Sequence, residues 1–531
     1  MTSTVQNPIL PGFNPDPSIC RVGKDYYIAT STFEWYPGVQ IHHSRDLVNW
    51  NLIARPLNRE DLLDMRGNPD SCGVWAPCLS FHEGYFYLVY TDVKRFDGHY
   101  KDTHNYLTRC QHIDGEWEPP VYLNSSGFDP SIFHAEDGRQ YICNMVWDHR
   151  SSEQFFGGIV LQEYSAEQQK LIGPSKLIFA GSELGRTEAP HLYWRDGYYY
   201  LITAEGGTGY EHAVTMARSK DLWGPYELDP IKHIVTSKDE PDYPLQKAGH
   251  ADFVEDESGT PWLVHLASRP LPGTDRCPLG RETALQQMVW TDEGWLRKAE
   301  DGITPDLQTK IPYKAQQWKL RHYIYDWNSL KLPDDFQWLR TPDPDAIFSL
   351  RDRPGYLRLI GRESIGSWFT QSLVARRQQA FNCQVTTRLC FESDTFQHAA
   401  GLVSYYNTEK FHYLLIRHDE ELGMCLEIMS CLADRDWMLE FADERVPLPA
   451  RHCKEGIYLR LDIAGPTLKF SWSLDGIAWQ GIGGTLDQSL LSDDCGTGAN
   501  FTGSFVGMAC QDTSGQAGHA DFEFFEYLEQ D

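Results

Sequence analysis

The chain has 531 residues, of which 41% are hydrophobic and 13% aromatic, so it is a well-packed globular protein too long for one hydrophobic core. The 75 acidic side chains outnumber the 47 basic ones and give a formal net charge of −28, which disfavours binding to nucleic acid or to an anionic membrane surface. No apolar run approaches the ~20 residues needed to span a bilayer.

The N-terminal segment and the cysteines indicate where the protein works. Residues 1–8 contain neither the charged nor the apolar region of a signal peptide. The 13 cysteines are odd in number and lack the spacing of a disulfide framework. We therefore expect a cytoplasmic protein with reduced thiols.

A short pattern at residues 12–19 organises the first part of the chain. Pro15 and Pro17 flank Asp16 and restrict the backbone on both sides of it. A turn and an aromatic β pattern at residues 24–28 follow, and together they predict a hairpin. Related segments begin at Trp75, Asp129, Glu188 and His250, and each also leads into an aromatic strand.

The spacing of these copies predicts the architecture. They begin at residues 16, 75, 129, 188 and 250, so the period is roughly 54–62 residues. This period is typical of a β-propeller, here with five blades of about four strands over residues 1–312. Because the innermost strands of all blades line one channel, the acids Asp16, Asp129 and Glu188 are expected in one pocket, beside Trp75 and His250.

The pattern changes after residue 312. A linker is expected at 313–322, followed by short alternating strands that turns separate. The clearest of these strands are 356–360, 383–389, 411–416, 456–462 and 468–473. They predict a β-sandwich over 323–531, of the concanavalin or jelly-roll type, so the whole chain is expected to be all-β.

Three carboxylates in one pocket suit the cleavage of a glycosidic bond. One must protonate the leaving oxygen, and another must activate water or attack the anomeric carbon. A third can orient the acid and raise its pKa. For any single acid, capping of a local turn is the simpler interpretation. Three acids at one repeat position favour catalysis.

Several segments resemble the motifs of glycoside hydrolase family 43. They are residues 12–19, 129–133, 186–191, 249–252 and 279–283. With the C-terminal sandwich, the chain is similar over nearly its whole length to the two-domain β-xylosidases of that family. The resemblance implies a five-bladed propeller whose active-site pocket the sandwich closes.

The same resemblance implies roles for the acids. Asp16 would be the general base, Glu188 the general acid, and Asp129 the residue that orients the acid and modulates its pKa. The family inverts configuration in one displacement, which requires the base and acid carboxyls to lie about 6.5–9.5 Å apart.

The resemblance also implies the substrate-binding residues. Arg281 would bind sugar hydroxyls near the base, and His250 would lie near the propeller axis under the active site. Aromatic walls are expected from Phe33, Trp75, Trp147 and Phe501, with Phe505 as the alternative to Phe501.

His250 has two open interpretations. In some members of the family a divalent cation such as calcium lies near the equivalent histidine, whereas other members have no metal. The alternative is a buried, hydrogen-bonded core histidine. The sequence contains no dedicated metal-binding motif, so we expect no required cofactor. The resemblance further implies a homo-oligomer, either a dimer or a tetramer.

The predicted function is exo-acting release of D-xylose from the non-reducing end of β-1,4-xylo-oligosaccharides, with side activity on α-L-arabinofuranosides. Three alternatives stay open. The enzyme could act primarily as an α-L-arabinofuranosidase, or the protein could bind carbohydrate without catalysis. The sandwich could also be an independent polysaccharide-binding module.

Overall fold

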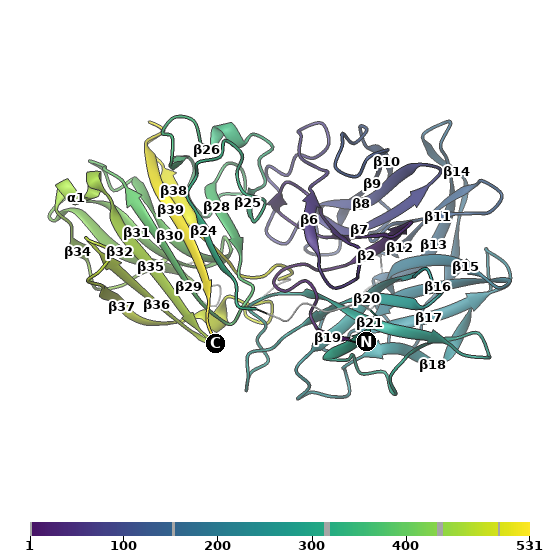
Figure 1. The fold of residues 1–531 in the computed structure, drawn as a ribbon. Coiled ribbons are helices and arrows are strands. Elements are labelled where there is room, and N and C mark those ends of the chain that lie inside the picture. Colours follow the sequence, from purple (N-terminus) through teal and green to yellow (C-terminus); the bar gives the residue numbers. More distant parts are fainter. Residues whose placement is uncertain (1–2, 151–153, 313–318, 433–438, 497–499) are drawn as a thin grey trace.

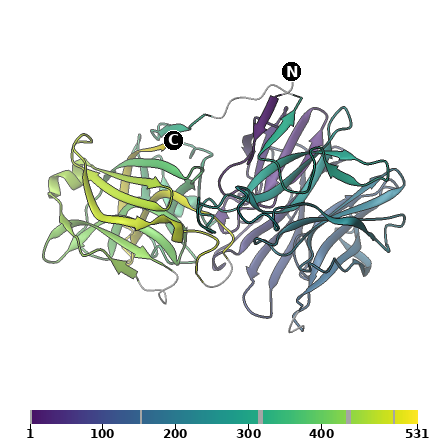
Figure 2. The same ribbon diagram turned by 90° about the horizontal axis from the view of Figure 1, so that it is seen from below.

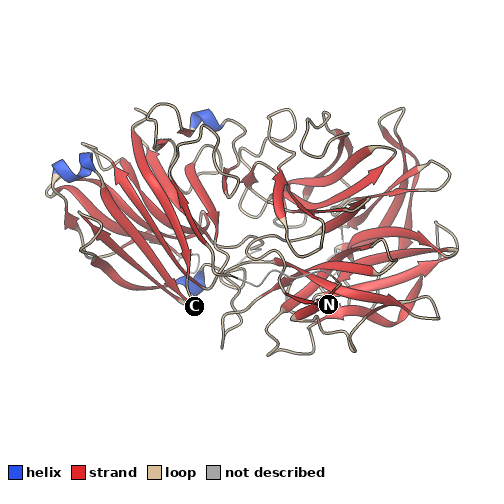
Figure 3. Ribbon diagram, viewed as in Figure 1, coloured by secondary structure: helices blue, strands red, loops and turns tan. Residues whose placement is uncertain are grey.

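A computed structural model describes residues 3–150, 154–312, 319–432, 439–496 and 500–531. Two all-β bodies lie side by side, one formed by the first three-fifths of the chain and the other by the rest (Figure 1). Strands dominate both bodies, and the only α-helix in the described residues is α1 (Ala450–Glu455) (Figure 3). None of the helices in this described part has the length and apolar character to cross a membrane.

The first body is a propeller of five four-stranded antiparallel sheets, as the sequence repeat predicts. Blade I contains β2 (Ser18–Val22), β3 (Asp25–Thr30), β5 (Gln40–Ser44) and β6 (Asn51–Ala54). Blade II contains β7 (Gly73–His82), β8 (Tyr85–Arg95), β9 (Asp102–Cys110) and β10 (Val121–Asn124). Blade III contains β11 (Ser131–His134), β12 (Gln140–Trp147), β13 (Phe156–Ser165) and β14 (Lys170–Phe179).

Blade IV contains β15 (Glu188–Arg195), β16 (Tyr198–Glu205), β17 (Ala213–Ser219) and β18 (Glu227–Thr236). Blade V contains β19 (Gln246–Glu255), β20 (Pro261–Ser268), β21 (Glu282–Trp290) and β22 (Leu296–Lys298). The first strands of consecutive blades contact one another, and β19 meets β2 to close the ring. Each repeat therefore begins at the propeller axis.

A small sheet joins the two ends of the propeller. In it, β1 (Ser3–Gln6) pairs with β23 (Gln308–Ile311) in antiparallel register. The side chain of Asn7 strengthens this closure, since its Nδ2 donates to the carbonyl oxygen of Leu285 at 2.9 Å. Of the predicted linker, 313–322, residues 313–318 lie outside the described residues.

The second body is the predicted sandwich. One sheet contains, in order, β26 (Phe348–Ser349), β27 (Leu357–Ile360), β39 (His519–Glu529), β29 (Asn382–Cys390), β35 (Ile457–Ala464), β36 (Thr467–Ser473) and β37 (Gln480–Asp487), with β24 (His322–Tyr325) also on β39. The other contains β33 (Leu439–Phe441), β32 (Gly423–Cys431), β31 (Lys410–Asp419), β30 (His398–Asn407), β38 (Phe505–Asp512), β28 (Ser372–Arg377), β25 (Phe336–Leu339) and β4 (Trp35–Tyr36), with β34 (Val446–Pro447) also on β32. Alternate side chains of both sheets, such as Leu402, Leu459 and Phe522, form one buried core.

The two bodies share a sheet. Strand β4 belongs by sequence to the first blade, but it pairs with β25 of the sandwich through Tyr36 with Trp338 and Trp35 with Leu339. The Trp35 ring is fully buried and stacks on Phe505 with the ring centroids 3.7 Å apart. A second view shows loops of both bodies meeting between them (Figure 2).

Candidate active site

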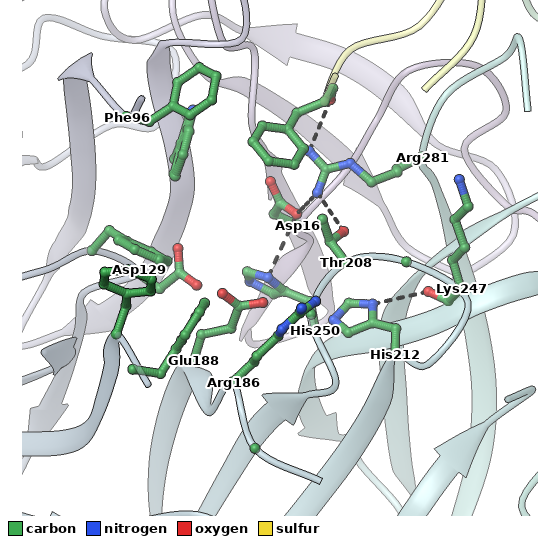
Figure 4. Close-up of a pocket in the computed structure, with 18 of the residues that line it drawn as sticks. Asp16, Phe96, Asp129, Arg186, Glu188, Thr208, His212, Lys247, His250 and Arg281 are labelled. Carbon is green, nitrogen blue, oxygen red and sulfur yellow. Dashed lines mark hydrogen bonds and ion pairs between the residues drawn. The ribbon is translucent and has the colours of Figure 1, made fainter. Parts of the chain in front are cut away.

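A cavity of about 1070 Å³ lies where the heads of the innermost propeller strands meet the sandwich. All nine residues that the sequence analysis predicts for the site line it: Asp16, Phe33, Trp75, Asp129, Trp147, Glu188, His250, Arg281 and Phe501. The three carboxylates enter from three different blades and point into a common space (Figure 4).

The sequence analysis expects all three acids at one repeat position, but the structure places Glu188 one residue earlier than Asp16 and Asp129. In each blade, one residue with a left-handed backbone lies two positions before the regularly paired part of the innermost strand. It is Asp16 and Asp129 in blades I and III, both with φ of 54°, and His250 in blade V, with φ of 47°. In blades II and IV this position is held by Ala76 and Ala189. Trp75 and Glu188 therefore lie one residue earlier, and a bulge follows each of them.

Hydrogen bonds fix the carboxylate of Asp16. The Ser31 hydroxyl donates to Oδ2 at 2.6 Å, and Arg281 Nη1 donates to Oδ1 at 3.1 Å. Ser31 is itself held, because its oxygen accepts the backbone N–H of Ala76 at 2.8 Å. His250 Nδ1 lies 3.6 Å from Oδ1. Asp16 thus has one orientation beside a positive charge.

Glu188 and Asp129 form a second acidic group. Burial, followed by the negative charge of Asp16, raises the pKa of Glu188 to about 8. Burial and the charges of Glu188 and Asp16 raise the pKa of Asp129 well above its usual range. Asp129 Oδ2 accepts the backbone N–H of Ala189 at 3.1 Å, which ties it to the residue after Glu188. At neutral pH Glu188 therefore retains its proton.

His250 is a neutral, buried side chain. Burial lowers its pKa to about 4, although Asp16 acts in the opposite direction. Within the described ranges, no group of three or more His, Cys, Asp or Glu side chains is arranged to hold a metal ion. Asp16 and His250 alone do not supply the six to eight oxygen ligands that calcium takes, so we derive no step through a metal.

Aromatic rings form the walls of the cavity. Phe33 packs against Trp75 and Phe501, with centroid separations of 5.7 and 6.0 Å. Phe501 reaches the cavity from the sandwich, and its carbonyl oxygen accepts Arg281 Nη2 at 2.9 Å. Phe505 is instead fully buried against Trp35. Of the two phenylalanines that the sequence analysis weighs, Phe501 therefore lines the site.

Further polar residues of the cavity escape sequence reasoning. Lys101 lies with its Nζ 4.3 Å from the Trp147 ring centroid, and burial lowers its pKa to about 8. His212 Nδ1 contacts the carbonyl oxygen of Lys247 at 3.0 Å, and Thr208 accepts Arg281 Nη1 at 3.0 Å. None of these residues lies at a repeat position, so no periodic signal marks them.

The sandwich contributes acids as well. Asp494 Oδ1 accepts the buried Lys247 Nζ at 2.6 Å, and its Oδ2 accepts the N–H of Cys277 at 3.0 Å. Burial raises the pKa of the neighbouring Asp493 to about 6.

Arg186 also lines the cavity. It lies two residues before Glu188, in a segment that the sequence analysis quotes, and this proximity is the one signal that could have identified it.

Carboxylates that face one another across a cavity are the groups that hydrolysis of a glycosidic bond requires. Residues 5–296 match the profile of glycosyl hydrolases family 43, and residues 325–528 match that of the β-xylosidase C-terminal concanavalin A-like domain. The chain therefore belongs to glycoside hydrolase family 43, and it is a glycosidase.

Individual relatives match over nearly the whole chain. "Xylosidase/arabinosidase 43B" of Humicola insolens is 53% identical and covers 98% of this chain and 97% of its own length. "Beta-xylosidase" of Bacillus subtilis is 49% identical over 99% of this chain and 100% of its own. The crystal structure of xylan β-1,4-xylosidase from Bacillus halodurans superposes with a TM-score of 0.95 at 50% identity, covering 99% of this chain and 100% of its own.

Proposed function

We propose that this glycosidase is an exo-acting, inverting β-xylosidase that releases D-xylose from the non-reducing end of β-1,4-xylo-oligosaccharides. The observation that carries the proposal is the contrast between two acids in one cavity. Asp16 is fixed by Ser31 and Arg281, whereas Glu188 has a pKa raised to about 8. Two carboxylates in different environments suit a base and an acid.

The proposed reaction is a single displacement. Asp16 takes a proton from a water molecule as that water attacks the anomeric carbon, and Glu188 gives its proton to the leaving oxygen. Asp129 holds the backbone after Glu188 through the N–H of Ala189 and thereby orients the acid. Arg281 stays beside Asp16 and binds a sugar hydroxyl.

The shape of the cavity supports exo attack on pentosides. Segments of the sandwich, including Phe501, cover the propeller axis, so a chain end can enter more readily than the middle of a polymer. Trp75 and Phe33 form one aromatic wall, with ring centroids 5.7 Å apart, and we propose that this wall excludes the hydroxymethyl group of a hexose. Xylose and arabinofuranose present similar hydroxyl patterns, and the name of the Humicola insolens relative combines both activities. We therefore propose side activity on α-L-arabinofuranosides.

Proton NMR of the sugar released from xylobiose tests the mechanism. Early α-xylose is the expected product, because inversion converts the β linkage to an α anomer. Early β-xylose would show retention and would make Asp16 a nucleophile. An arabinofuranoside run in parallel measures the second activity. Cleavage of the arabinoside alone would make the enzyme primarily an arabinofuranosidase, and cleavage of neither would favour a non-catalytic carbohydrate-binding protein.

We also propose that the reaction requires no metal cofactor. The support is that, in the described part of the chain, no third His, Cys, Asp or Glu joins Asp16 and His250 in an arrangement that could hold a metal ion. Dialysis against EDTA should then leave kcat/KM on xylobiose within about twofold of the untreated value. A larger loss that calcium restores would favour the cation site near His250.

The remaining expectations concern location and assembly. Twelve of the 13 cysteines, all but Cys495, are free thiols, which suits the reducing cytoplasm. We propose a cytoplasmic homo-oligomer, either a dimer or a tetramer. Cell fractionation and light scattering on the purified protein test these two statements, and a monomeric mass would contradict the second.

A further inference from the structure

Two arginines meet where blade I packs against the sandwich, and of these Arg377 is buried and Arg55 half-buried. Arg55 lies just beyond β6, and Arg377 is the last residue of β28. Both bond to consecutive residues of β25: Arg55 Nη1 donates to the carbonyl oxygen of Phe336 at 3.2 Å, and Arg377 Nη1 donates to Oε1 of Gln337 at 2.6 Å. Two positive charges from distant parts of the chain therefore lie at one short strand.

Neither guanidinium has a carboxylate partner. In the described ranges, no Asp or Glu oxygen lies within ion-pair distance of Arg55 or Arg377, whose acceptors are backbone carbonyls and glutamine side chains. The nearby Asp334 pairs with Lys331 at 2.8 Å, and Asp335 accepts the hydroxyl of Tyr325 at 2.5 Å. Both aspartates favour the charged form of Arg55 through space, and Asp335 does the same for Arg377, but neither carboxylate bonds directly to a guanidinium.

Three buried nitrogens at this place lack any hydrogen-bond partner among the described residues: Arg55 Nε, Arg377 Nη2 and His42 Nδ1. His42 is only 8% exposed and Arg377 only 6%. On β5, His42 follows Gln40 by two residues, so both side chains lie on one face of the strand. Gln40 in turn accepts Arg55 Nη2 at 2.9 Å, which places His42 beside the arginines.

The protonation states define what could bind there. Burial and the two arginines lower the pKa of His42 to about 3, so its ring is neutral and has one N–H to donate. Burial and Arg55 also lower the pKa of Arg377, but a guanidinium keeps its proton in proteins. Arg55 Nε and Arg377 Nη2 are therefore charged donors, and His42 Nδ1 is a third donor in the tautomer that carries the proton on this nitrogen.

Buried donors in native proteins are almost always bonded, and a charged donor is bonded best by a negative acceptor. A small anion that accepts hydrogen bonds would satisfy all three nitrogens, which are nearly closed to solvent. We propose that Arg55, Arg377 and His42 form a binding site for one small monovalent anion of halide size, with chloride as the occupant.

The site lies directly behind the loop that carries Asp16. Arg377 Nε donates to the carbonyl oxygen of Phe13 at 2.5 Å, and Gln40 Nε2 donates to Oδ1 of Asn14 at 2.8 Å. An anion that holds the two arginines also holds this loop. Its effect on turnover rests on the proposed role of Asp16, whereas binding of the anion does not.

Exchange of chloride for gluconate at constant ionic strength tests the proposal, because gluconate is too large to enter. Saturating chloride should raise Tm by about 2 °C and increase kcat/KM on an aryl xyloside severalfold, each along a saturable curve. Arg55→Gln should abolish both responses. The control is Arg45→Gln, an exposed arginine of the same blade paired with Asp25, which should keep them.

Crystals grown with bromide provide a direct measurement. An anomalous peak is expected between Arg55 and Arg377 in the wild type and should be absent in Arg55→Gln, so the test does not depend on folding of an Arg377 variant. Absence of the peak, together with equal Tm values in chloride and gluconate, would overturn the proposal. Both readouts remain decisive even if the protein cleaves no xyloside.

Discussion

Backbone conformation at single residues arranges the acids in the cavity. Asp16 and Asp129 both have φ of 54°, a region that non-glycine residues seldom adopt and that costs free energy. Ala189 has φ of 51°, so in blade IV the same turn is made one residue after the acid. Glu188 therefore enters the cavity from a different backbone position than the other two acids, which suits a different chemical role.

The proposed role of Glu188 as general acid predicts a dependence on the leaving group. Glu188→Ala should reduce kcat on xylobiose by roughly 10²–10⁴, because the departing sugar then leaves without a proton. An aryl xyloside with a strongly acidic phenol needs little protonation and should lose far less. Steady-state kinetics on both substrates measure the difference. Glu183→Ala, at the rim of the same cavity, is the control, and equal losses on both substrates for Glu188→Ala would argue against the acid.

The electrostatics of Glu188 predict the alkaline limb of the pH profile. In the proposed mechanism Glu188 must be protonated, so kcat/KM should fall as pH rises through its pKa of about 8, and the observed value belongs to the coupled acids together. Arg186 and Arg281 favour the ionised form and lower this pKa. Arg186→Gln should therefore raise it and move the alkaline limb upward by roughly 0.2–0.5 pH unit.

Arg139→Gln provides the matched control for that shift. Arg139 is an exposed arginine of blade III that bonds to Asp137, and it does not line the cavity. Its pH profile should coincide with that of the wild type. A downward shift in Arg186→Gln would show that another group determines the alkaline limb.

At the scale of elements, the segment 500–504, which carries Phe501 and is called the strap below, must pass close to the propeller. Gly280 has φ of +72°, and a Cβ added there would lie 2.2 Å from the carbonyl oxygen of Thr502. Gly280→Ala should push this strap away and weaken the contact of Arg281 with Phe501. We expect a lower Tm and a loss of about tenfold or more in kcat/KM, since small misplacements of site residues are costly.

Gly273→Ala separates the collision from backbone strain. Gly273 has a similar φ of +77°, but a Cβ there would meet nothing within 4 Å. This variant should share the modest strain of an alanine with positive φ and keep its kcat/KM. Similar kinetics in the two variants would show that close approach of the strap is unimportant.

The elements also show which features could be predicted. The blades follow from local chemistry, because prolines beside Asp16 and Asp129 and Gly-containing turns such as Gly138 mark each hairpin within a few residues. Strand β4 could not be predicted in the sandwich. It has only two residues, Trp35 and Tyr36, and its partner β25 lies about 300 residues away in the chain.

The same limit applies to the site. Asp16, Asp129 and Glu188 could be found because repetition marks them, and their convergence follows from propeller closure. Lys101 and His212 stand outside the repeat, and only tertiary packing brings them to the cavity. The offset of Glu188 from the position of Asp16 could not be predicted either. The left-handed residue in blade IV is Ala189, and alanine does not indicate a left-handed backbone in a sequence.

At the scale of the whole molecule, the shared sheet and cavity predict that neither body works alone. A fragment of residues 1–312 would expose Trp35 and lack the wall that Phe501 provides. It should be poorly soluble or at least about 100-fold less active in kcat/KM on xylobiose. Residues 320–531 alone should not be retained on xylan, because the sandwich supplies only part of the cavity lining and the propeller supplies the rest.

A point variant separates loss of the wall from loss of folding. Phe501→Ala in the full chain should raise KM about tenfold or more while Tm changes by only a few degrees, because Phe501 is partly exposed in the cavity. Phe396→Ala, an exposed phenylalanine of the sandwich, should leave KM unchanged. A fully active propeller fragment would contradict the shared cavity, and xylan retention by the sandwich alone would make that domain an independent binding module.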